Sequence, residues 1–187
     1  RFSTYSLSLT GMEKADRGIG PFCEDREKNV WVGTRNGLWF FNSQTHSFYE
    51  YSLKKSNIRY DVRSLLLEGD NLWVGTFSKG VKVVDTRTGA IVKTYQKTDS
   101  PRSLIDNSVF SICRTTTGDI YLGTLFGLLR YNRQSDDFDR IPELNARFVY
   151  DIKEDSGGNL WLATYANGAY CYNVSEKKWK NYLHNEN

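Results

Sequence analysis

The chain has 187 residues, a formal net charge of +3, 39% hydrophobic residues and 14% aromatic residues. That length is ample for one domain with its own core. The net charge is too small to indicate a nucleic-acid-binding protein, and the longest apolar stretch, residues 120–129, is too short and too interrupted to span a membrane. What remains is a domain rich in Val, Ile, Thr and aromatic residues, which favour β-strands.

Four similar segments follow one another along the chain. The second predicted strand of each segment begins with an apolar residue, Trp or Tyr, and an aliphatic residue. The strand continues with Gly or Ala and then Thr. A short loop and another Gly come next. The aromatic anchors of these strands are Trp31, Trp73, Tyr121 and Trp161. A period of roughly 40–50 residues with strand-like composition is typical of the blades of a β-propeller.

Each segment predicts four strands in the same order. A short apolar strand comes first, at residues 19–23, 62–66, 109–113 and 149–153. A polar turn leads to the anchor strand, and a third strand follows at residues 38–42, 81–85, 128–132 and 169–173. A fourth strand with spaced aromatic residues ends the segment. Because no apolar pattern has a helical period, we predict an all-β fold, a β-propeller of four-stranded antiparallel blades.

The predicted blades span residues 17–53, 59–97, 107–141 and 147–183. Residues 1–10 match the pattern of a fourth strand and are predicted to close a preceding blade. We therefore expect the chain to be a fragment, an arc of a larger propeller. Its end blades are then expected to expose apolar faces and to cause self-association.

Residues 152–164, which read IKEDSGGNLWLAT, together with Gly168, Tyr172, Asn173 and Trp179, resemble the two-component regulator propeller repeat. Residues 38–48 are similar to the third and fourth strands of that repeat. The resemblance covers nearly the whole chain, four times over. The fourth segment has Ala163 where the other three have Gly, a departure that leaves the fold prediction unchanged.

The resemblance implies the periplasmic sensor region of a hybrid two-component protein from a Bacteroides-type bacterium. It implies that a membrane helix, a histidine kinase and a DNA-binding part lie further along the parent chain, which would act in transcription regulation as a dimer. The implied ligand is an oligosaccharide from polysaccharide breakdown. The expected partners are this ligand and the remaining blades of the same chain. We expect no cofactor, no metal and no nucleic-acid contact by this fragment.

A propeller lyase and a protein-binding scaffold are the two alternatives to a sensor. A propeller lyase similar to the streptogramin lyases needs a catalytic histidine, but the only histidines are His46, in a predicted hairpin, and His184, in the C-terminal tail. Neither has neighbours at the spacing of a catalytic triad or a metal site. The fragment is therefore predicted not to be an enzyme. A protein-binding scaffold without catalysis remains the main alternative.

Three further features are predicted to be structural. Cys23 and Cys113 occupy equivalent positions in non-adjacent blades, too far apart for a disulfide, and Cys171 lies on a third strand, so the thiols are expected to be free and buried. The recurring anchors Trp31, Trp73 and Trp161 are expected to pack between blades rather than to bind sugars. The acidic residues 136–139 are expected to form a solvated hairpin turn.

Ligand contacts are expected in the loops that lead into the inner strands and in the loops that follow the anchor strands, because function on such scaffolds concentrates in loops. Aromatic rings stack on sugar faces, and Arg and Asn bind hydroxyls or carboxylates. The candidate residues are Arg17, Arg35, Asn36, Arg59, Tyr60, Phe77, Lys79, Arg102, Asn107, Phe126, Arg147, Tyr165 and Asn167. The alternative is that surface loops simply contain polar residues.

The charge of these loops suggests a ligand class. Arg17, Arg59, Arg102 and Arg147 all precede predicted inner strands. If they lie along one rim, they could hold an anionic oligosaccharide, such as one with uronic acid or sulfate groups, through bidentate contacts.

Overall fold

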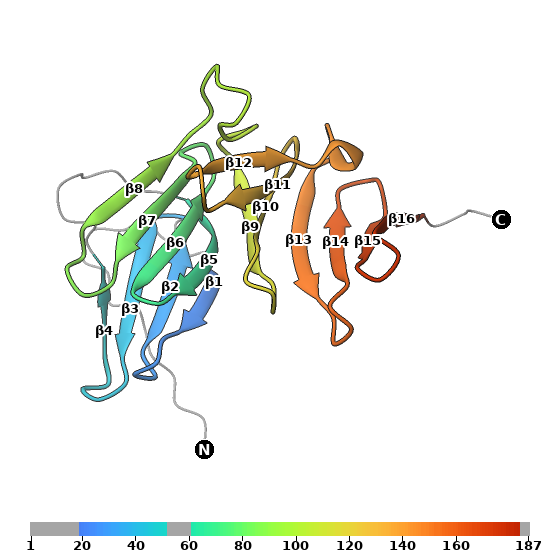
Figure 1. Ribbon diagram of the computed structural model, residues 1–187. Coiled ribbons are helices and arrows are strands. Elements are labelled where there is room, and N and C mark those ends of the chain that lie inside the picture. The colour runs from blue at the N-terminus through green and yellow to red at the C-terminus, as the bar shows by residue number, and fades with distance from the viewer. Residues whose placement is uncertain (1–18, 52–60, 184–187) are drawn as a thin grey trace.

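The computed structural model describes residues 19–51 and 61–183. These residues form sixteen strands in four antiparallel sheets of four strands each (Figure 1). The one helical segment in this part of the chain is a 3-10 turn at Pro142–Leu144. The predicted all-β fold with four-stranded antiparallel blades is therefore confirmed.

Each blade contains four consecutive strands, hydrogen-bonded in chain order. Blade 1 has β1 (Ile19–Glu24), β2 (Val30–Thr34), β3 (Gly37–Asn42) and β4 (Ser47–Glu50). Blade 2 has β5 (Val62–Glu68), β6 (Asn71–Thr76), β7 (Val81–Asp85) and β8 (Ile91–Tyr95). Blade 3 has β9 (Val109–Arg114), β10 (Ile120–Thr124), β11 (Gly127–Asn132) and β12 (Asp137–Arg140). Blade 4 has β13 (Val149–Glu154), β14 (Leu160–Thr164), β15 (Ala169–Asn173) and β16 (Lys178–Tyr182).

The repeated Thr and Gly close the loop between the second and third strands of every blade. The Thr hydroxyl donates a hydrogen bond to the carbonyl of the loop glycine, over 3.0 Å from Thr34 to Gly37 and 2.7 Å from Thr76 to Gly80. Blades 3 and 4 repeat the bond. The φ of Gly80 is 73°, in the left-handed region that glycine adopts without strain. The sequence pattern therefore encodes this turn directly.

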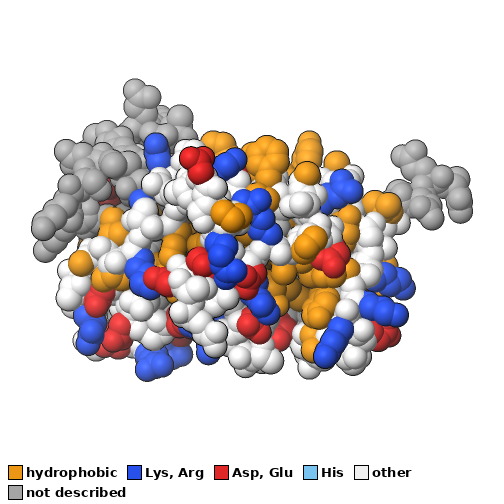
Figure 2. Space-filling view, turned by 45° about the horizontal axis from the view of Figure 1, so that its top comes forward, with side chains coloured by type: hydrophobic (Ala, Val, Ile, Leu, Met, Phe, Trp, Pro, Cys, Tyr) orange, Lys and Arg blue, Asp and Glu red, His pale blue; other side chains and the backbone are white. Residues whose placement is uncertain are grey.

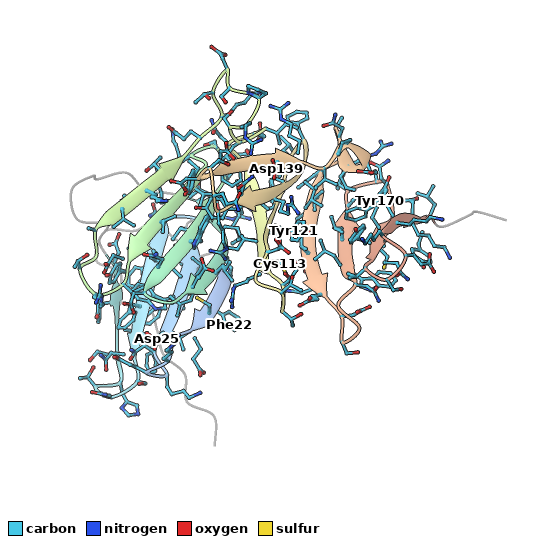
Figure 3. All side chains as sticks on the ribbon, in the orientation of Figure 1. Phe22, Asp25, Cys113, Tyr121, Asp139 and Tyr170 are labelled. Atoms are coloured by element: carbon cyan, nitrogen blue, oxygen red, sulfur yellow. The ribbon has the colours of Figure 1, made fainter. Side chains whose placement is uncertain are left out.

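Neighbouring blades pack face to face through the aromatic anchors. Trp31 shares a core cluster with Val62 and Leu72 of blade 2. The ring centroid of Trp73 lies 4.9 Å from that of Tyr131 in blade 3. Tyr121 lies between blades 3 and 4 and packs against the core cluster of blade 4 (Figure 3). Each of these three anchors therefore packs against the blade that follows it.

A glycine on the anchor strand lets the next inner strand come close. A Cβ added to Gly33 would lie 2.5 Å from Cγ1 of Val62, and one added to Gly123 would lie 2.8 Å from Cγ1 of Val149. Non-bonded carbons prefer roughly 3.5–4.0 Å. The repeated glycine therefore sets the spacing between blades, which a larger residue would widen.

The prediction that the three Trp anchors are core residues is confirmed for two and wrong for the third. Trp31 is 1% exposed and Trp73 is 4% exposed, but Trp161 is 37% exposed. In the described part of the chain, no sheet packs on the face of blade 4 that corresponds to the covered faces of blades 1 to 3. Burial of an anchor depends on the next blade, and Trp161 has none over it here.

The described cysteines lie within this packing as free thiols. Cys171 is buried, whereas Cys23 and Cys113 are partly buried. Burial, with a smaller contribution from the nearby Asp25 carboxylate, raises the pKa of Cys23 to about 11. Because the thiolate is the reactive form, this shift lowers the reactivity of Cys23 at neutral pH.

No helix within residues 19–51 or 61–183 has the length and apolar character needed to cross a bilayer.

Candidate functional site

The site is built by a β-bulge that recurs in the inner strand of blades 2, 3 and 4. In β5, Val62 pairs with Thr76 and Ser64 with Gly75, which leaves Arg63 as the extra residue. The same shift leaves Phe110 extra in β9 and Tyr150 extra in β13. The pairing of β1 shifts in the corresponding region, next to Gly20. Bulges commonly re-aim a side chain and are frequent beside functional sites.

These bulge residues line one central pocket. Its volume is about 590 Å³, and all four blades contribute to it. Gly20, Arg63, Phe110 and Tyr150 come from the inner strands of blades 1 to 4 in turn. Because a single position in the repeat supplies one lining residue from each blade, the pocket is a product of the propeller architecture itself.

A continuous row of aromatic rings, two of which line this pocket, crosses blades 2, 3 and 4. We call Phe77, Phe110, Phe148, Tyr150 and Tyr165 the aromatic row. Consecutive ring centroids lie 6.2 Å apart for Phe77 and Phe110, 4.4 Å for Phe110 and Phe148, and 5.9 Å for Phe148 and Tyr165. Figure 2 shows hydrophobic side chains along the upper rim of the molecule and in a second group right of its centre.

Much of the aromatic row is open to solvent. Tyr165 is 71% exposed, Tyr150 is 59% exposed and Phe77 is 45% exposed. Exposed rings that touch one another across three blades are not needed to bury a core, since the blade cores lie elsewhere. Contiguous exposed apolar surface of this kind marks interaction sites.

One cation is fixed within the row. The Arg63 guanidinium carbon lies 5.6 Å from the ring centroid of Phe77 and 5.8 Å from that of Phe110. Its Nη2 pairs with Oδ2 of Asp61 at 2.7 Å. Arg63 Nε and Asp61 Oδ1 are buried and have no hydrogen-bond partner among the described residues. The ion pair is therefore largely enclosed beside the rings, with side chains that are 33% exposed for Arg63 and 24% exposed for Asp61.

The structure brings together some of the residues that the sequence nominated. Phe77 and Tyr165 belong to the aromatic row, and Arg35 lines the central pocket. Phe126 is 49% exposed on the loop between β10 and β11, but no ring contact joins it to the row. Arg17, Arg59 and Tyr60 lie outside the described residues.

Other nominated residues have structural contacts instead. Asn36 is 6% exposed and lies inside its loop. Asn107 Oδ1 accepts a hydrogen bond from the backbone of Lys97 at 2.7 Å. The carbonyl of Asn167 accepts one from Asn181 Nδ2 at 2.9 Å.

Two nominated cations also make loop contacts through their backbone. The backbone N–H of Lys79 bonds Thr76 Oγ1 at 3.1 Å, and the backbone N–H of Arg147 bonds the carbonyl of Leu144 at 3.2 Å. These bonds fix the loops and leave the side chains of Lys79 and Arg147 without an assigned role.

The position of Arg102 differs from the predicted rim of arginines. Its Nε pairs with Asp137 at 2.5 Å, and its Nη2 lies 3.1 Å from Asp139. Both carboxylates are on β12, the outermost strand of blade 3, so Arg102 faces the outside of the blade rather than the central pocket. The expected solvated turn at residues 136–139 is found in part: Asp136 lies exposed in the turn between β11 and β12, but the carboxylates also pair with Lys93, Arg102 and Arg130.

The sequence contained a signal for the residues that were missed. Arg63, Phe110 and Tyr150 each follow the valine that packs over the glycine of the preceding blade. Strict alternation along the inner strands would not place these side chains in the pocket. Only the bulge, which is invisible in the pattern of apolar residues, turns them inward.

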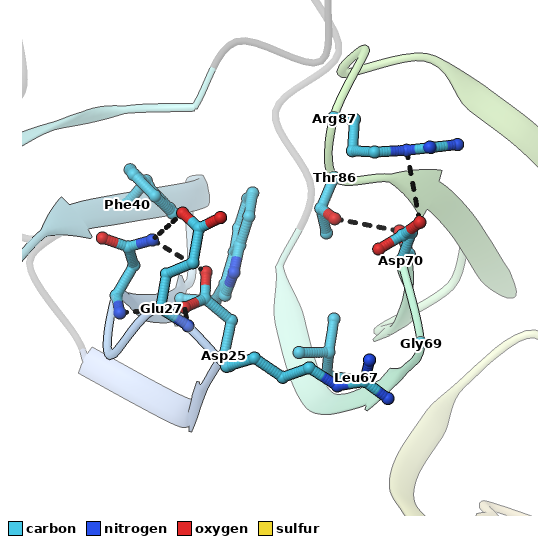
Figure 4. A pocket seen from close by; sticks show the side chains of 11 residues that line it. Asp25, Glu27, Phe40, Leu67, Gly69, Asp70, Thr86 and Arg87 are labelled. Atoms are coloured by element: carbon cyan, nitrogen blue, oxygen red, sulfur yellow. Dashed lines mark hydrogen bonds and ion pairs between the residues drawn. The ribbon is translucent and has the colours of Figure 1, made fainter.

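A second, smaller crevice lies between blades 1 and 2 (Figure 4). Its volume is about 280 Å³, and its carboxylates already have partners. Asp25 accepts hydrogen bonds from the backbone N–H groups of Glu27 and Asn29, both at 2.9 Å, and Asp70 pairs with Arg87 at 3.2 Å. These bonds build the turns of the two blades, so this crevice is the weaker candidate.

Catalytic groups are sparse around the central pocket. His46, the histidine within the described ranges, lies exposed in the turn between β3 and β4, where its ring contacts Phe41. His184 lies outside the described residues. The described ranges also contain no cluster of His, Cys, Asp and Glu that could hold a metal ion. The pocket offers ring faces, the ion pair of Arg63 and Asp61, the side chains of Arg35 and Asp151, and backbone groups, which suit binding.

Together these features define the class of protein, a β-propeller with four-stranded blades and an aromatic site at its centre. Comparisons with known proteins refine that class. Residues 143–166 match the family profile described as "Two component regulator propeller". The chain is 31% identical over 175 residues to histidine kinase P4 of Formosa agariphila, a match that covers 87% of this chain and 13% of the kinase. The chain therefore contains the two-component regulator propeller repeat, as its sequence predicted.

Solved structures show the same fold. The extracellular domain of BT3049 from B. thetaiotaomicron, described as a hybrid two-component system, is similar with a TM-score of 0.75 at 18% identity, over 90% of this chain and 25% of that domain. Virginiamycin B lyase from Staphylococcus aureus is similar with a TM-score of 0.67 at 16% identity, over 90% of this chain and 56% of the lyase. At these identities the similarities establish the fold alone. The chain thus spans only a small part of the kinase and of the sensor domain that it resembles.

Proposed function

We propose that this chain is a non-catalytic ligand-binding propeller in the extracytoplasmic, periplasmic sensor region of a histidine-kinase receptor, and that its ligand is an oligosaccharide. The observation that carries the proposal is the aromatic row over the central pocket. Rings that are exposed, in mutual contact and aimed by bulges provide several stacking faces in sequence. An oligosaccharide presents the matching series of apolar sugar faces.

The charges at the site favour a neutral ligand over the anionic one suggested by the arginine positions. The central pocket is lined by two arginines, Arg35 and Arg63, and by two carboxylates, Asp61 and Asp151, so its formal charges balance. Arg102 is paired with Asp137 outside the site. Sugar hydroxyls can both donate and accept, so they match a pocket lined by both guanidinium and carboxylate groups better than a carboxylate or sulfate would.

Signalling would follow from geometry rather than chemistry. The aromatic row takes its rings from blades 2, 3 and 4, so a ligand that spans it interacts with three blades at once. Such a ligand shifts the output of a receptor only if it binds two arrangements of the blades with different affinity. The kinase that would respond lies outside this chain.

A calorimetric screen of oligosaccharides against the chain tests this proposal. We expect saturable binding of a neutral oligosaccharide, weakened about three- to tenfold by Tyr165→Ala, because each stacked ring contributes roughly 0.5–1.5 kcal/mol. Tyr49→Ala, which removes an exposed ring from β4, is the control and should leave the affinity unchanged.

The salt dependence of binding separates the ligand classes. Exposed charges are screened within roughly 8–10 Å at physiological ionic strength. Affinity that is independent of salt supports the neutral ligand, and affinity that falls steeply with salt restores the anionic one. A blank screen combined with a protein bound through the aromatic row would instead support the docking scaffold. Turnover of a bound ligand would contradict the non-catalytic assignment.

A further inference from the structure

The bulge position of the inner strand carries a planar side chain in three blades and no side chain in the remaining one. Arg63, Phe110 and Tyr150 occupy it in blades 2, 3 and 4, whereas blade 1 has Gly20 in the corresponding region. All four residues line the central pocket. The pocket therefore has planar groups on three blades and only backbone at this position on blade 1.

Neighbouring bulge residues lie against one another. The guanidinium carbon of Arg63 lies 5.8 Å from the ring centroid of Phe110. The rings of Phe110 and Tyr150 are stacked at an interplanar angle of 28°, with centroids 6.1 Å apart. Planar groups thus follow one another from blade 4 to blade 2, and the series ends at Gly20 of blade 1.

The two rings that contact Arg63 leave one side of its guanidinium open. The guanidinium carbon lies 5.6 Å from the centroid of Phe77 and 5.8 Å from that of Phe110, and these two centroids are 6.2 Å apart. Rings on opposite sides of the guanidinium would be much further from each other, so both lie to one side of it. Because the Arg63 side chain is 33% exposed and lines the pocket, its other side is accessible from there.

Gly20 lies close enough to blade 2 for a group beside it to reach Arg63. A Cβ added to Gly20 would lie 3.2 Å from the carbonyl oxygen of Val62, the residue before Arg63. Pro21 adds an apolar ring to the same part of the pocket. The space that a side chain at residue 20 would fill is therefore part of the pocket, whose volume of about 590 Å³ is typical of ligand sites.

The groups around this space favour a neutral aromatic ligand group. A guanidinium is attracted to the face of an aromatic ring, as Arg63 already is to Phe77 and Phe110. A sugar ring has no π face and lacks this attraction. Because the two arginines and two carboxylates of the pocket balance in formal charge, a charged aromatic group would gain no net attraction over a neutral one.

We propose that the space beside Gly20 binds an aromatic substituent of the oligosaccharide, such as a phenolic ester, with its ring stacked on the guanidinium of Arg63. This inference rests on the proposed function, in which the sugar units occupy the aromatic row. The ligand then continues from the aromatic row into the pocket. Gly20 provides the room for the substituent, and Arg63 selects a planar ring.

NMR titrations with two neutral amides of similar size, benzamide and cyclohexanecarboxamide, test this subsite. We expect benzamide to shift the signals of Gly20 and Arg63 saturably and to bind about two- to fivefold more tightly, the usual effect of an exposed cation–π contact. Arg63→Lys keeps the positive charge but removes the planar guanidinium, so it should abolish this preference. Arg102→Lys changes an arginine that is paired outside the pocket, and this control should leave the preference unchanged.

Gly20→Phe tests the space itself. Its ring would occupy the proposed subsite, so benzamide should no longer shift the signals of Arg63. Circular dichroism would verify that this variant is folded, and if it is not, Arg63→Lys decides the test. Equal affinities for the two amides, a preference that survives Arg63→Lys, or benzamide shifts confined to Phe77, Phe148 and Tyr165 would overturn the proposal.

Calorimetry with phenyl and cyclohexyl glycosides of the best oligosaccharide from the screen tests the link to the sugar. We expect the phenyl glycoside to bind about two- to fivefold more tightly to the wild type and equally to Arg63→Lys. Oligosaccharide binding without this preference would overturn the aromatic subsite and leave the proposed function standing. Benzamide binding beside Gly20 combined with a blank oligosaccharide screen would support the aromatic subsite and contradict the proposed oligosaccharide ligand.

Discussion

At the scale of single residues, the same amino acid in the same repeat position has different roles in different blades. Trp73 packs between Tyr95 of its own blade and Tyr131 of the next, with ring centroids 5.6 and 4.9 Å away. Within the described residues, the one ring contact of Trp161 is with Tyr182, and its Nε1 donates a hydrogen bond to Asp155 at 2.8 Å. The residue is Trp at both positions, but it is buried only where a neighbouring blade packs on it.

This difference predicts unequal effects of the same substitution. We expect Trp73→Ala to lower the free energy of unfolding by roughly 3–5 kcal/mol, the usual cost of truncating a buried aromatic residue. Trp161→Ala should cost less than about 2 kcal/mol, because a third of its side chain is already in water. Urea titrations of both variants measure the two values. Equal losses would mean that Trp161 is covered in solution.

At the scale of strands and blades, one carboxylate ties blade 2 to blade 3. Asp136, in the turn before β12, accepts hydrogen bonds from Lys93 and Tyr131 at 2.6 Å and from Tyr95 at 2.5 Å. Burial alone would raise the pKa of Asp136, but these three hydrogen bonds outweigh it and hold the pKa at about 2. Burial and the bond to Asp136 in turn raise the pKa of Tyr95.

The depressed pKa predicts a pH dependence. An ordinary Asp has a pKa of about 3.9 in an unfolded chain. The Asp136 carboxylate therefore stabilises the fold above about pH 4, and that contribution is lost as the pH falls toward 2. Because the pair with Lys93 is nearly half exposed, we expect about 1 kcal/mol after solvent screening. Denaturation of Asp136→Asn at a series of pH values should show a lower stability at pH 7 and a shallower loss below pH 4. Parallel curves of stability against pH for the wild type and the variant would contradict this role of Asp136.

The spacing between blades gives a second prediction at this scale. Gly123→Ala places a methyl group against Val149 of the next blade, so we expect a loss of roughly 1–3 kcal/mol from overpacking. Ala163→Gly makes the reverse change on the uncovered face of blade 4, where we expect no more than about 1 kcal/mol of change in the free energy of unfolding of the monomer. Thermal unfolding at low protein concentration measures the change in stability of both variants. A neutral Gly123→Ala variant would show that the inner strands are not held at this distance.

The fold was predictable from the sequence because local chemistry repeats. The Thr and Gly that close each loop, and the anchor that alternates with aliphatic residues, act within one blade and recur in all four. The site was only partly predictable. Phe77 and Tyr165 lie on loops and could be nominated, but Arg63, Phe110 and Tyr150 reach the pocket through bulges whose register depends on pairing with the neighbouring strand. The partners of Arg102 lie more than thirty residues away in sequence, which no local pattern reveals.

At the scale of the whole molecule, the four blades surround one pocket to which each contributes from its inner strand. The aromatic row crosses blades 2, 3 and 4 at one end of the inner strands, while the turns around Asp25 and Asp70 occupy the other (Figure 1). A ligand bound at the row therefore touches several blades, and a ligand bound at the crevice around Asp25 and Asp70 touches only two. The position of bound ligand is thus the feature that most directly separates a central sensor site from any other use of this propeller.

Backbone amide NMR of the chain, titrated with the best oligosaccharide from the calorimetric screen, measures that position. We expect the largest chemical-shift changes at Arg63, Phe110 and Tyr150 and in the loops that hold Phe77 and Tyr165, with little change near Asp25 and Asp70. Changes confined to the turns around Asp25 and Asp70, or none at all in the presence of saturating ligand, would contradict a ligand site at the centre of the propeller.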